Sequence, residues 1–190
     1  MSATFAMLLL WVGWQGAWRL AARMTKRSAA RPPIAEERLY WLLLVTGPTL
    51  LLLGAVRPYT QWAVIWLPPP AFEWACVLLA ALGFAFTFWA RAHLGLLWSD
   101  NVARKADHRV VDTGPYGLVR HPIYTGCLVA ALATLLLRPG LFTLSGFVLF
   151  ALGFYIKARM EERFLGETLG PEYAAYRGRV PMLVPFWPRG

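Results

Sequence analysis

The amino-acid sequence predicts an all-α fold: a single integral membrane domain, residues 1–190, built as a bundle of five transmembrane helices with a cytoplasmic loop and a helical C-terminal tail. Three observations predict it. Hydrophobic residues make up 58% of the chain and charged residues only 15%, against roughly 45–50% and about 25% in soluble domains. Five apolar runs approach the length of a membrane crossing. Lysine and arginine gather in segments that alternate with these runs.

Each apolar run is expected to form one transmembrane helix, for which about 20 apolar residues are needed. Gly47-Pro48 predicts a kink in the second run. Arg138-Pro139-Gly140 predicts a turn that makes the last two runs an antiparallel hairpin. These two runs are short and would cross with local thinning of the bilayer. The expected spans are about residues 4–20, 39–56, 71–90, 123–137 and 141–156.

The distribution of positive charge predicts the topology. Seventeen of the 19 lysines and arginines lie in three segments, residues 19–38, 91–120 and 157–190, and the other two are Arg57 and Arg138. Cytoplasmic segments carry the excess of positive charge. The N-terminus is therefore expected outside, with loop 91–122 and tail 157–190 in the cytoplasm. This topology explains the net charge of +9 without a nucleic-acid partner.

Several kinds of chemistry are excluded by spacing. Cys76 and Cys127 lie inside apolar runs, so neither a disulfide framework nor a cysteine-based zinc site is expected. The three histidines are 15 and 13 residues apart, and no metal site is predicted. The chain has no GxG pair and no GxSxG motif, which argues against a Rossmann cofactor domain and a serine hydrolase.

Residues 114–126, GPYGLVRHPIYTG, are the most informative stretch of the cytoplasmic loop. Pro122 favours a helix start there, so the positive end of the fourth span would face the cytoplasm and could bind a carboxylate. Tyr116 and Tyr124 would offer ring faces to a cation. The alternative is an Arg120, His121 and tyrosine cluster that only anchors a helix at the interface, and both interpretations remain open.

Two further features have a functional and a plain interpretation. Glu161-Glu162 would lie about one turn beyond the fifth span and could hold a cationic or hydroxyl-rich ligand. They could equally pair with Lys157, Arg159 or Arg163 on a solvated helix face.

Arg91 follows directly on the third span. It could snorkel to the membrane interface or present its planar fork to a carboxylate. Trp98 and Ser99 follow in the same loop.

Together these residues resemble the isoprenylcysteine carboxyl methyltransferase family. The first motif runs from Arg91 through Trp98-Ser99, His108 and Gly114-Pro115-Tyr116 to Arg120-His121-Pro122-x-Tyr124-x-Gly126. The second runs from Glu161-Glu162 through Leu169-Gly170-x-Glu172-Tyr173-x-x-Tyr176 to Arg179-Val180-Pro181. The related phospholipid methyltransferases share the Arg-His-Pro element and the paired acids. The resemblance covers about residues 84–186.

The resemblance implies a membrane enzyme that uses S-adenosylmethionine and releases S-adenosylhomocysteine. The cofactor would sit in a cytoplasmic pocket roofed by the tail, and a lipophilic small molecule or lipid would enter from the membrane. Arg91, Glu161 and Glu162 would be catalytic, and Arg91, Trp98 and Ser99 would bind the acceptor. The residues expected to bind the cofactor are His108, Val110, Val111, Gly114, Tyr116, Arg120, His121, Pro122, Tyr124 and Glu162.

Three functions follow as expectations. The first is O-methylation of a lipophilic carboxylate such as a prenylated cysteine, with Arg91 orienting the carboxylate. The second is N-methylation of a phospholipid head group or a small lipophilic amine, with His108 or Glu161 as the base. The third is a non-catalytic membrane protein of the same fold.

Overall fold

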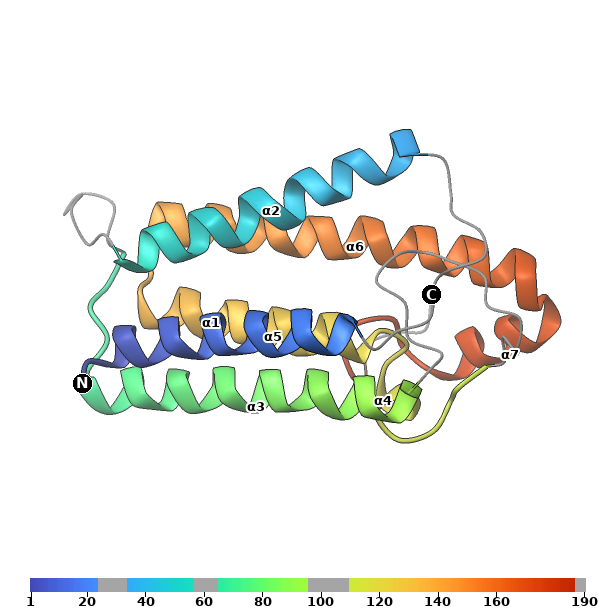
Figure 1. The fold of residues 1–190 in the computed structure, drawn as a ribbon, viewed down its shortest axis with the longest axis horizontal. Coiled ribbons are helices and arrows are strands. Elements are labelled where there is room, and N and C mark those ends of the chain that lie inside the picture. Colours follow the sequence, from blue (N-terminus) through green and yellow to red (C-terminus); the bar gives the residue numbers. More distant parts are fainter. Residues whose placement is uncertain (24–33, 57–64, 96–109, 187–190) are drawn as a thin grey trace.

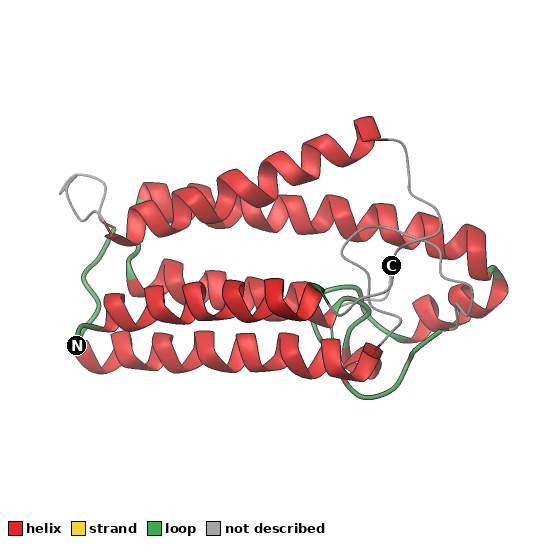
Figure 2. Cartoon of the chain, in the orientation of Figure 1, coloured by secondary structure: helices red, strands yellow, loops and turns green. Residues whose placement is uncertain are grey.

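The computed structural model describes residues 1–23, 34–56, 65–95 and 110–186. Across these residues the chain forms helices and loops and no strand, which confirms the all-helical fold (Figure 2). The helices are α1 (Ala3–Ala22), α2 (Ile34–Val56), α3 (Pro70–Leu94), α4 (Pro115–Leu118), α5 (Pro122–Leu137), α6 (Leu141–Leu169) and α7 (Pro171–Arg179).

The long helices lie side by side in two closely packed pairs, α2 with α6 and α3 with α5, and α1 packs beside α3 (Figure 1). Glycines let the backbones touch. A Cβ atom on Gly83 would lie 2.7 Å from the carbonyl oxygen of Gly126, and one on Gly47 would lie 2.6 Å from the backbone nitrogen of Phe150. Such small residues are typical of helix contacts in membranes, where close van der Waals packing replaces the hydrophobic effect.

Tryptophans of α1 fasten that helix to its neighbours. The Trp11 indole is 2% exposed, and its N–H donates to the Thr134 hydroxyl on α5 at 3.0 Å. The Trp14 N–H donates to the Thr87 hydroxyl on α3 at 2.8 Å. Phe84 packs edge-on against Trp11, with ring centroids 5.0 Å apart. These bonds satisfy polar groups that would be costly inside a bilayer.

Three of the described helices are long and apolar enough to cross a membrane: residues 37–56 of α2, α3 and α6. The apolar helix α5 has only 16 residues, in agreement with the short fourth span. α1 has 20 residues, but Gln15 and Arg19 make it less apolar. The structure therefore supports an integral membrane protein, and the count of five spans stays a prediction.

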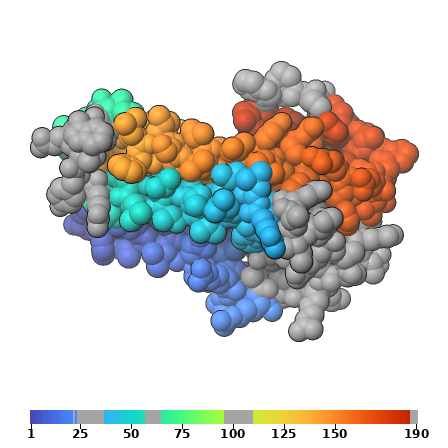
Figure 3. Space-filling view, turned by 90° about the horizontal axis from the view of Figure 1, so that it is seen from above, coloured from blue at the N-terminus to red at the C-terminus, as the bar shows by residue number. Residues whose placement is uncertain are grey.

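The polar segments gather at one end of the bundle. α6 is a single helix of 29 residues that continues past the expected fifth span to Leu169. Gly170, with φ of 55°, separates it from α7. In the space-filling view, the orange and red residues of α6 and α7 extend beyond the end of α2 (Figure 3). α4, the start of α5 and α7 therefore share one end of the molecule (Figure 1).

Candidate active site

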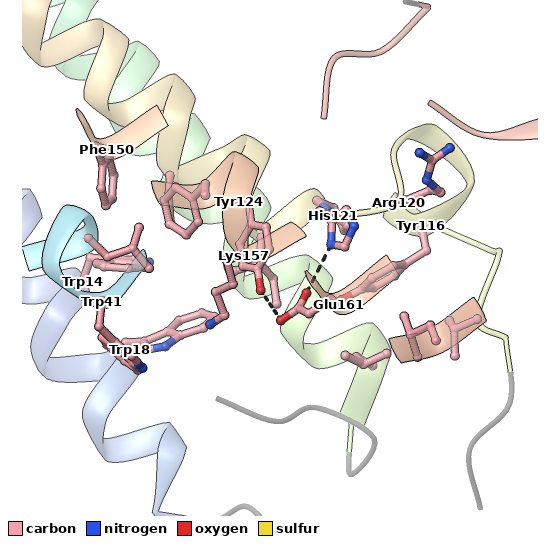
Figure 4. A pocket seen from close by; sticks show the side chains of 18 of the residues that line it. Trp14, Trp18, Trp41, Tyr116, Arg120, His121, Tyr124, Phe150, Lys157 and Glu161 are labelled. Atoms are coloured by element: carbon pink, nitrogen blue, oxygen red, sulfur yellow. Dashed lines mark hydrogen bonds and ion pairs between the residues drawn. The ribbon is translucent and has the colours of Figure 1, made fainter. Parts of the chain in front are cut away.

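A cavity of about 470 Å³ is lined by residues of all seven helices of the described part of the chain, and its volume lies within the roughly 300–1,000 Å³ of small-molecule sites. Its wall changes character along its length (Figure 4). The polar end is formed by Tyr116, Arg120, His121, Glu161, Tyr173 and Tyr176. The aromatic end is formed by Trp11, Trp14, Trp18, Trp41, Phe150 and Phe154. Tyr124 and Lys157 lie between the two ends (Figure 4).

Glu161 is held in position by two side chains that follow the Gly-Pro turn. The Tyr124 hydroxyl donates to Glu161 Oε1 at 2.5 Å, and His121 Nδ1 lies 3.4 Å from Glu161 Oε2. The His121 and Tyr124 rings stack nearly parallel, with centroids 5.3 Å apart. On its other side Tyr124 stacks on Phe154 at 4.7 Å. These contacts therefore hold the Glu161 carboxylate in one orientation, where the polar end of the cavity meets Tyr124 and Lys157.

Glu162 points elsewhere, because consecutive residues of an α-helix lie about 100° apart around its axis. The Arg120 guanidinium donates from Nε to Glu162 Oε1 at 2.7 Å, and both side chains are 3% exposed. It also donates from Nη1 to the carbonyl oxygens of Val180, at 2.5 Å, and Arg177, at 2.9 Å. Arg120 and Glu162 therefore connect the tail to α6, and we call this pair with its two carbonyl bonds the tail clamp. Glu162 does not line the cavity.

The tail closes the polar end through backbone bonds. The N–H of Arg120 donates to the Pro181 carbonyl at 2.8 Å, and the N–H of His121 donates to the Met182 carbonyl at 3.1 Å. The Tyr176 hydroxyl donates to the Tyr116 carbonyl at 2.8 Å. Two N–H groups immediately before α5, the region where the sequence suggested carboxylate binding, are thus used to hold the tail.

Burial and charge set the ionisation of the polar end. Burial on its own would lower the pKa of His121, but hydrogen bonds to the carboxylates of Glu161 and Glu162 outweigh it, so the pKa rises. Burial, with the charge of Glu161, raises the pKa of Tyr116 above its usual range. Burial also raises the pKa of Tyr173 and Tyr176. This end of the cavity therefore presents neutral phenols, the Glu161 carboxylate and a histidine whose protonated form is favoured by Glu161 and Glu162.

Arg91 is not part of the cavity wall. Its Nη2 donates to the carbonyl oxygen of Ala21 at 2.5 Å, and its guanidinium lies 4.9 Å from the centre of the Trp18 ring. Since Trp18 does line the cavity, Arg91 contacts the aromatic end through this ring. Gly114 also lies outside the cavity wall. Its role is structural, because its φ is 57° and a Cβ atom at this position would lie 2.8 Å from the His93 ring.

The structure brings most of the expected site residues together. Outside the cavity wall lie Arg91, Gly114 and Glu162, and Trp98, Ser99 and His108 lie outside the described residues. The expected residues in the wall are Val110, Val111, Tyr116, Arg120, His121, Pro122, Tyr124 and Glu161.

Sequence reasoning missed the aromatic end and Lys157. Trp11, Trp14 and Trp18 recur at helical spacing and share one face of α1, a signal that was available in the sequence. The Lys157 side chain is buried, at 7% exposure, in the wall one helical turn before Glu161. Tyr40, on α2, is fully buried against Met160.

Comparisons with known proteins agree with this arrangement. Residues 75–167 match the isoprenylcysteine carboxyl methyltransferase (ICMT) family. The chain is 30% identical over 161 residues to the protein-S-isoprenylcysteine O-methyltransferase of Schizosaccharomyces pombe, covering 78% of this chain and 68% of that protein. It is 34% identical over 177 residues to a methanethiol S-methyltransferase of Mycobacterium tuberculosis, covering 83% of this chain and 66% of that protein.

A third relative is the cobalt-zinc-cadmium resistance protein CzcN of Cupriavidus metallidurans, 29% identical over 147 residues, covering 76% of this chain and 62% of that protein. The chain thus spans less than two thirds of the length of the last two relatives. The match over residues 75–167 includes most of the polar end, with α5 and most of α6. On this evidence the chain belongs to the isoprenylcysteine carboxyl methyltransferase family.

Proposed function

We propose that the chain transfers a methyl group from S-adenosylmethionine to a lipophilic acceptor held at membrane depth. The observation that carries this proposal is the two-part cavity, which joins a polar end to an end lined by tryptophan and phenylalanine. A polar donor and an apolar acceptor would meet near Tyr124, Lys157 and Glu161. Methyl transfer needs such a meeting, because it is a direct displacement between two bound molecules.

The residues of the polar end fit this cofactor. S-adenosylmethionine carries a sulfonium cation, an ammonium group and an aromatic base, and when bound it would supply an electrophilic methyl group. Glu161 would place a carboxylate near the cations. The ring faces of Tyr116 and Tyr173 suit cationic and aromatic groups.

Other contacts would prepare the site for transfer. Tyr124 and His121 hold the Glu161 carboxylate still, which aligns it in advance. The tail, bonded to residues 120 and 121, would keep water from the donor.

The acceptor end favours an apolar molecule that enters from the bilayer. Relatives are named for methylating isoprenylcysteine and methanethiol, which leaves carboxylate oxygen and sulfur as acceptor atoms. The carboxylate expected from the sequence depends on Arg91, which contacts the Trp18 ring and does not line the cavity. The N-methylation alternative is disfavoured, because a protonated amine has no free electron pair to attack the methyl carbon and ordinarily keeps its proton up to about pH 10.

We also propose the topology expected from the sequence: five spans, the N-terminus outside, and the cavity's polar end and the C-terminus in the cytoplasm. Supporting this, Arg19, Arg120, Lys157 and Arg177 all belong to the end of the bundle where the tail packs, whereas Arg138 lies at the other end. Reporter fusions at the two termini would test the orientation: active cytoplasmic reporters at both ends would contradict it.

The decisive experiment is a labelled-methyl transfer assay on the full chain in detergent, with a prenylcysteine analogue, phosphatidylethanolamine and simple hydrophobic thiols, amines and acids. We expect transfer to at least one lipophilic acceptor. Calorimetry with S-adenosylhomocysteine is the companion measurement. Absence of both binding and transfer would instead support the non-catalytic alternative.

A further inference from the structure

Lys157 occupies the position in the cavity where donor and acceptor would meet. It lies on α6 four residues before Glu161, so the two side chains leave the same helix face one turn apart. Its ammonium nitrogen is 5.5 Å from the centre of the Tyr124 ring, 5.7 Å from that of Tyr40 and 5.8 Å from that of Trp41. A cation and a carboxylate therefore lie together in a wall that is otherwise built mostly of aromatic and aliphatic side chains (Figure 4).

The titratable and charged groups around Lys157 come from every helix that packs there. α2 contributes Tyr40, α5 contributes Tyr124 and Cys127, α6 contributes Glu161, and Arg19 reaches the cavity from α1. Of these, Glu161 is the acid in the wall. Arg120, the other arginine in the wall, already bonds Glu162 and two tail carbonyls.

These surroundings discriminate between acceptor chemistries. A carboxylate enters already ionised, loses its hydration among tryptophan rings, and is best bound by a guanidinium fork. An amine enters as an ammonium ion, and its pKa of about 10.4 makes loss of the proton harder than for a thiol, whose pKa is about 8.5. A thiol enters neutral, its polarisable sulfur makes favourable contacts with aromatic rings, and it becomes a strong nucleophile only after losing a proton. A proton acceptor and a cation in one wall suit that last case.

We infer that the acceptor is a lipophilic thiol, that Glu161 accepts its proton, and that Lys157 stabilises the resulting thiolate. This rests on the proposed methyltransferase function and specifies its substrate class. In the ionisation step the S–H bond breaks, its electron pair stays on the acceptor sulfur, and the proton moves to the Glu161 carboxylate. That electron pair then forms the bond to the methyl carbon while the bond from this carbon to the donor's sulfonium sulfur would break, its electrons staying on that sulfur and leaving neutral S-adenosylhomocysteine. The product is a neutral thioether, and the proton on Glu161 leaves to solvent.

The test is the pH dependence of kcat/KM for a hydrophobic thiol, measured on the full chain in detergent for the wild type, Lys157→Met and Lys157→Arg. A positive charge nearby lowers the pKa of an acidic group by about 1–3 units. We expect Lys157→Met to move the ionisation of the bound thiol about 1–2 units upward, with a roughly 10- to 100-fold loss of kcat/KM at neutral pH that shrinks as the pH rises. Lys157→Arg keeps the charge and should retain most of the rate.

Controls separate this inference from the proposed function. Arg159→Met removes a cation from the exposed face of the same helix and should leave the pH profile unchanged. Affinity for S-adenosylhomocysteine, measured by calorimetry, should be the same in Lys157→Met as in the wild type. A wild-type pH profile in Lys157→Met would overturn the inference. Methylation of carboxylates or amines but not thiols would also overturn it while leaving the methyltransferase function standing, whereas no binding and no transfer would defeat both.

Discussion

The two ends of the bundle each contain an arginine–glutamate pair, and the pairs have different surroundings. At the cavity end, Arg120 and Glu162 are both 3% exposed, and Arg120 also bonds two carbonyls of the tail. At the other end, Arg138 pairs with Glu73 at 2.5 Å, with side chains 27% and 21% exposed. The first pair holds a segment over a cavity, and the second joins the α5–α6 turn to the start of α3. The two pairs have the same chemistry, so their different roles come from the segments that each pair holds in place.

The largest effect is expected from Arg120→Met. Removing one partner of a buried ion pair typically costs about 3–5 kcal/mol of unfolding free energy. We expect the low end of this range, because Glu162 keeps His121 at 3.4 Å and Arg177 at 3.9 Å. The tail would also lose two hydrogen bonds, so affinity for S-adenosylhomocysteine should fall. Thermal unfolding in detergent and calorimetry measure the two effects.

The double variant Arg120→Met with Glu162→Met is the matched control, because it removes the guanidinium and the carboxylate together and leaves neither buried without the other. We expect it to recover much of the lost stability. A single variant as stable as the wild type would show that the tail clamp contributes little.

Glu161→Gln should lower the rate of methyl transfer by about 100-fold or more, in the range that general acid–base groups contribute. Affinity for S-adenosylhomocysteine should change less than affinity for S-adenosylmethionine, because the product has no sulfonium charge. The exposed Glu167→Gln, on the same helix, is the control and should behave as the wild type. An equal loss of methyl-transfer rate in both variants would show that Glu161 has no specific role in the reaction.

The adjacent acids also show how far sequence reasoning reaches. The helices follow from apolar runs bounded by proline and glycine, and the start of α5 at Pro122 lies one residue from its expected position. The pairing of Arg120 with Glu162, and of Tyr124 with Glu161, depends on how α5 and the tail dock on α6. A sequence gives the periodicity of a helix, but it does not show which neighbour each face meets.

The direction of Arg91 was beyond sequence reasoning for the same reason. Its position just after an apolar run predicted snorkelling or a contact with a carboxylate. Neither prediction uses the helix that packs beside Arg91, because a sequence does not show which helix that is. In the structure the side chain turns to Trp18 and the Ala21 carbonyl on α1, a helix 70 residues away in the sequence. The three tryptophans of α1 had a readable period, but their role required knowing that α1 lies beside the cavity.

A pH-dependent effect is expected from His121, whose pKa is raised above its ordinary value of 6.5 by the two carboxylates. The imidazolium therefore stabilises the fold fully below about pH 6.5, and this contribution is lost as the pH rises through the raised pKa. Melting temperatures of the wild type should decline across that range. In His121→Asn this decline should be absent, and an identical slope in both proteins would contradict the charged pair.

The smallest effect is expected from Arg138→Met, at the end of the bundle without the cavity. Partly exposed ion pairs contribute about 0–1 kcal/mol, and the turn retains other bonds: the Thr143 hydroxyl donates to the Arg138 carbonyl at 2.6 Å and accepts from the Gly140 N–H at 3.0 Å. The unfolding temperature should therefore fall slightly, while the rate of methyl transfer and the affinity for S-adenosylhomocysteine stay unchanged. If Arg138→Met impaired binding as much as Arg120→Met, the two pairs would be coupled through α5, and the separation of a structural end from a functional end would be wrong.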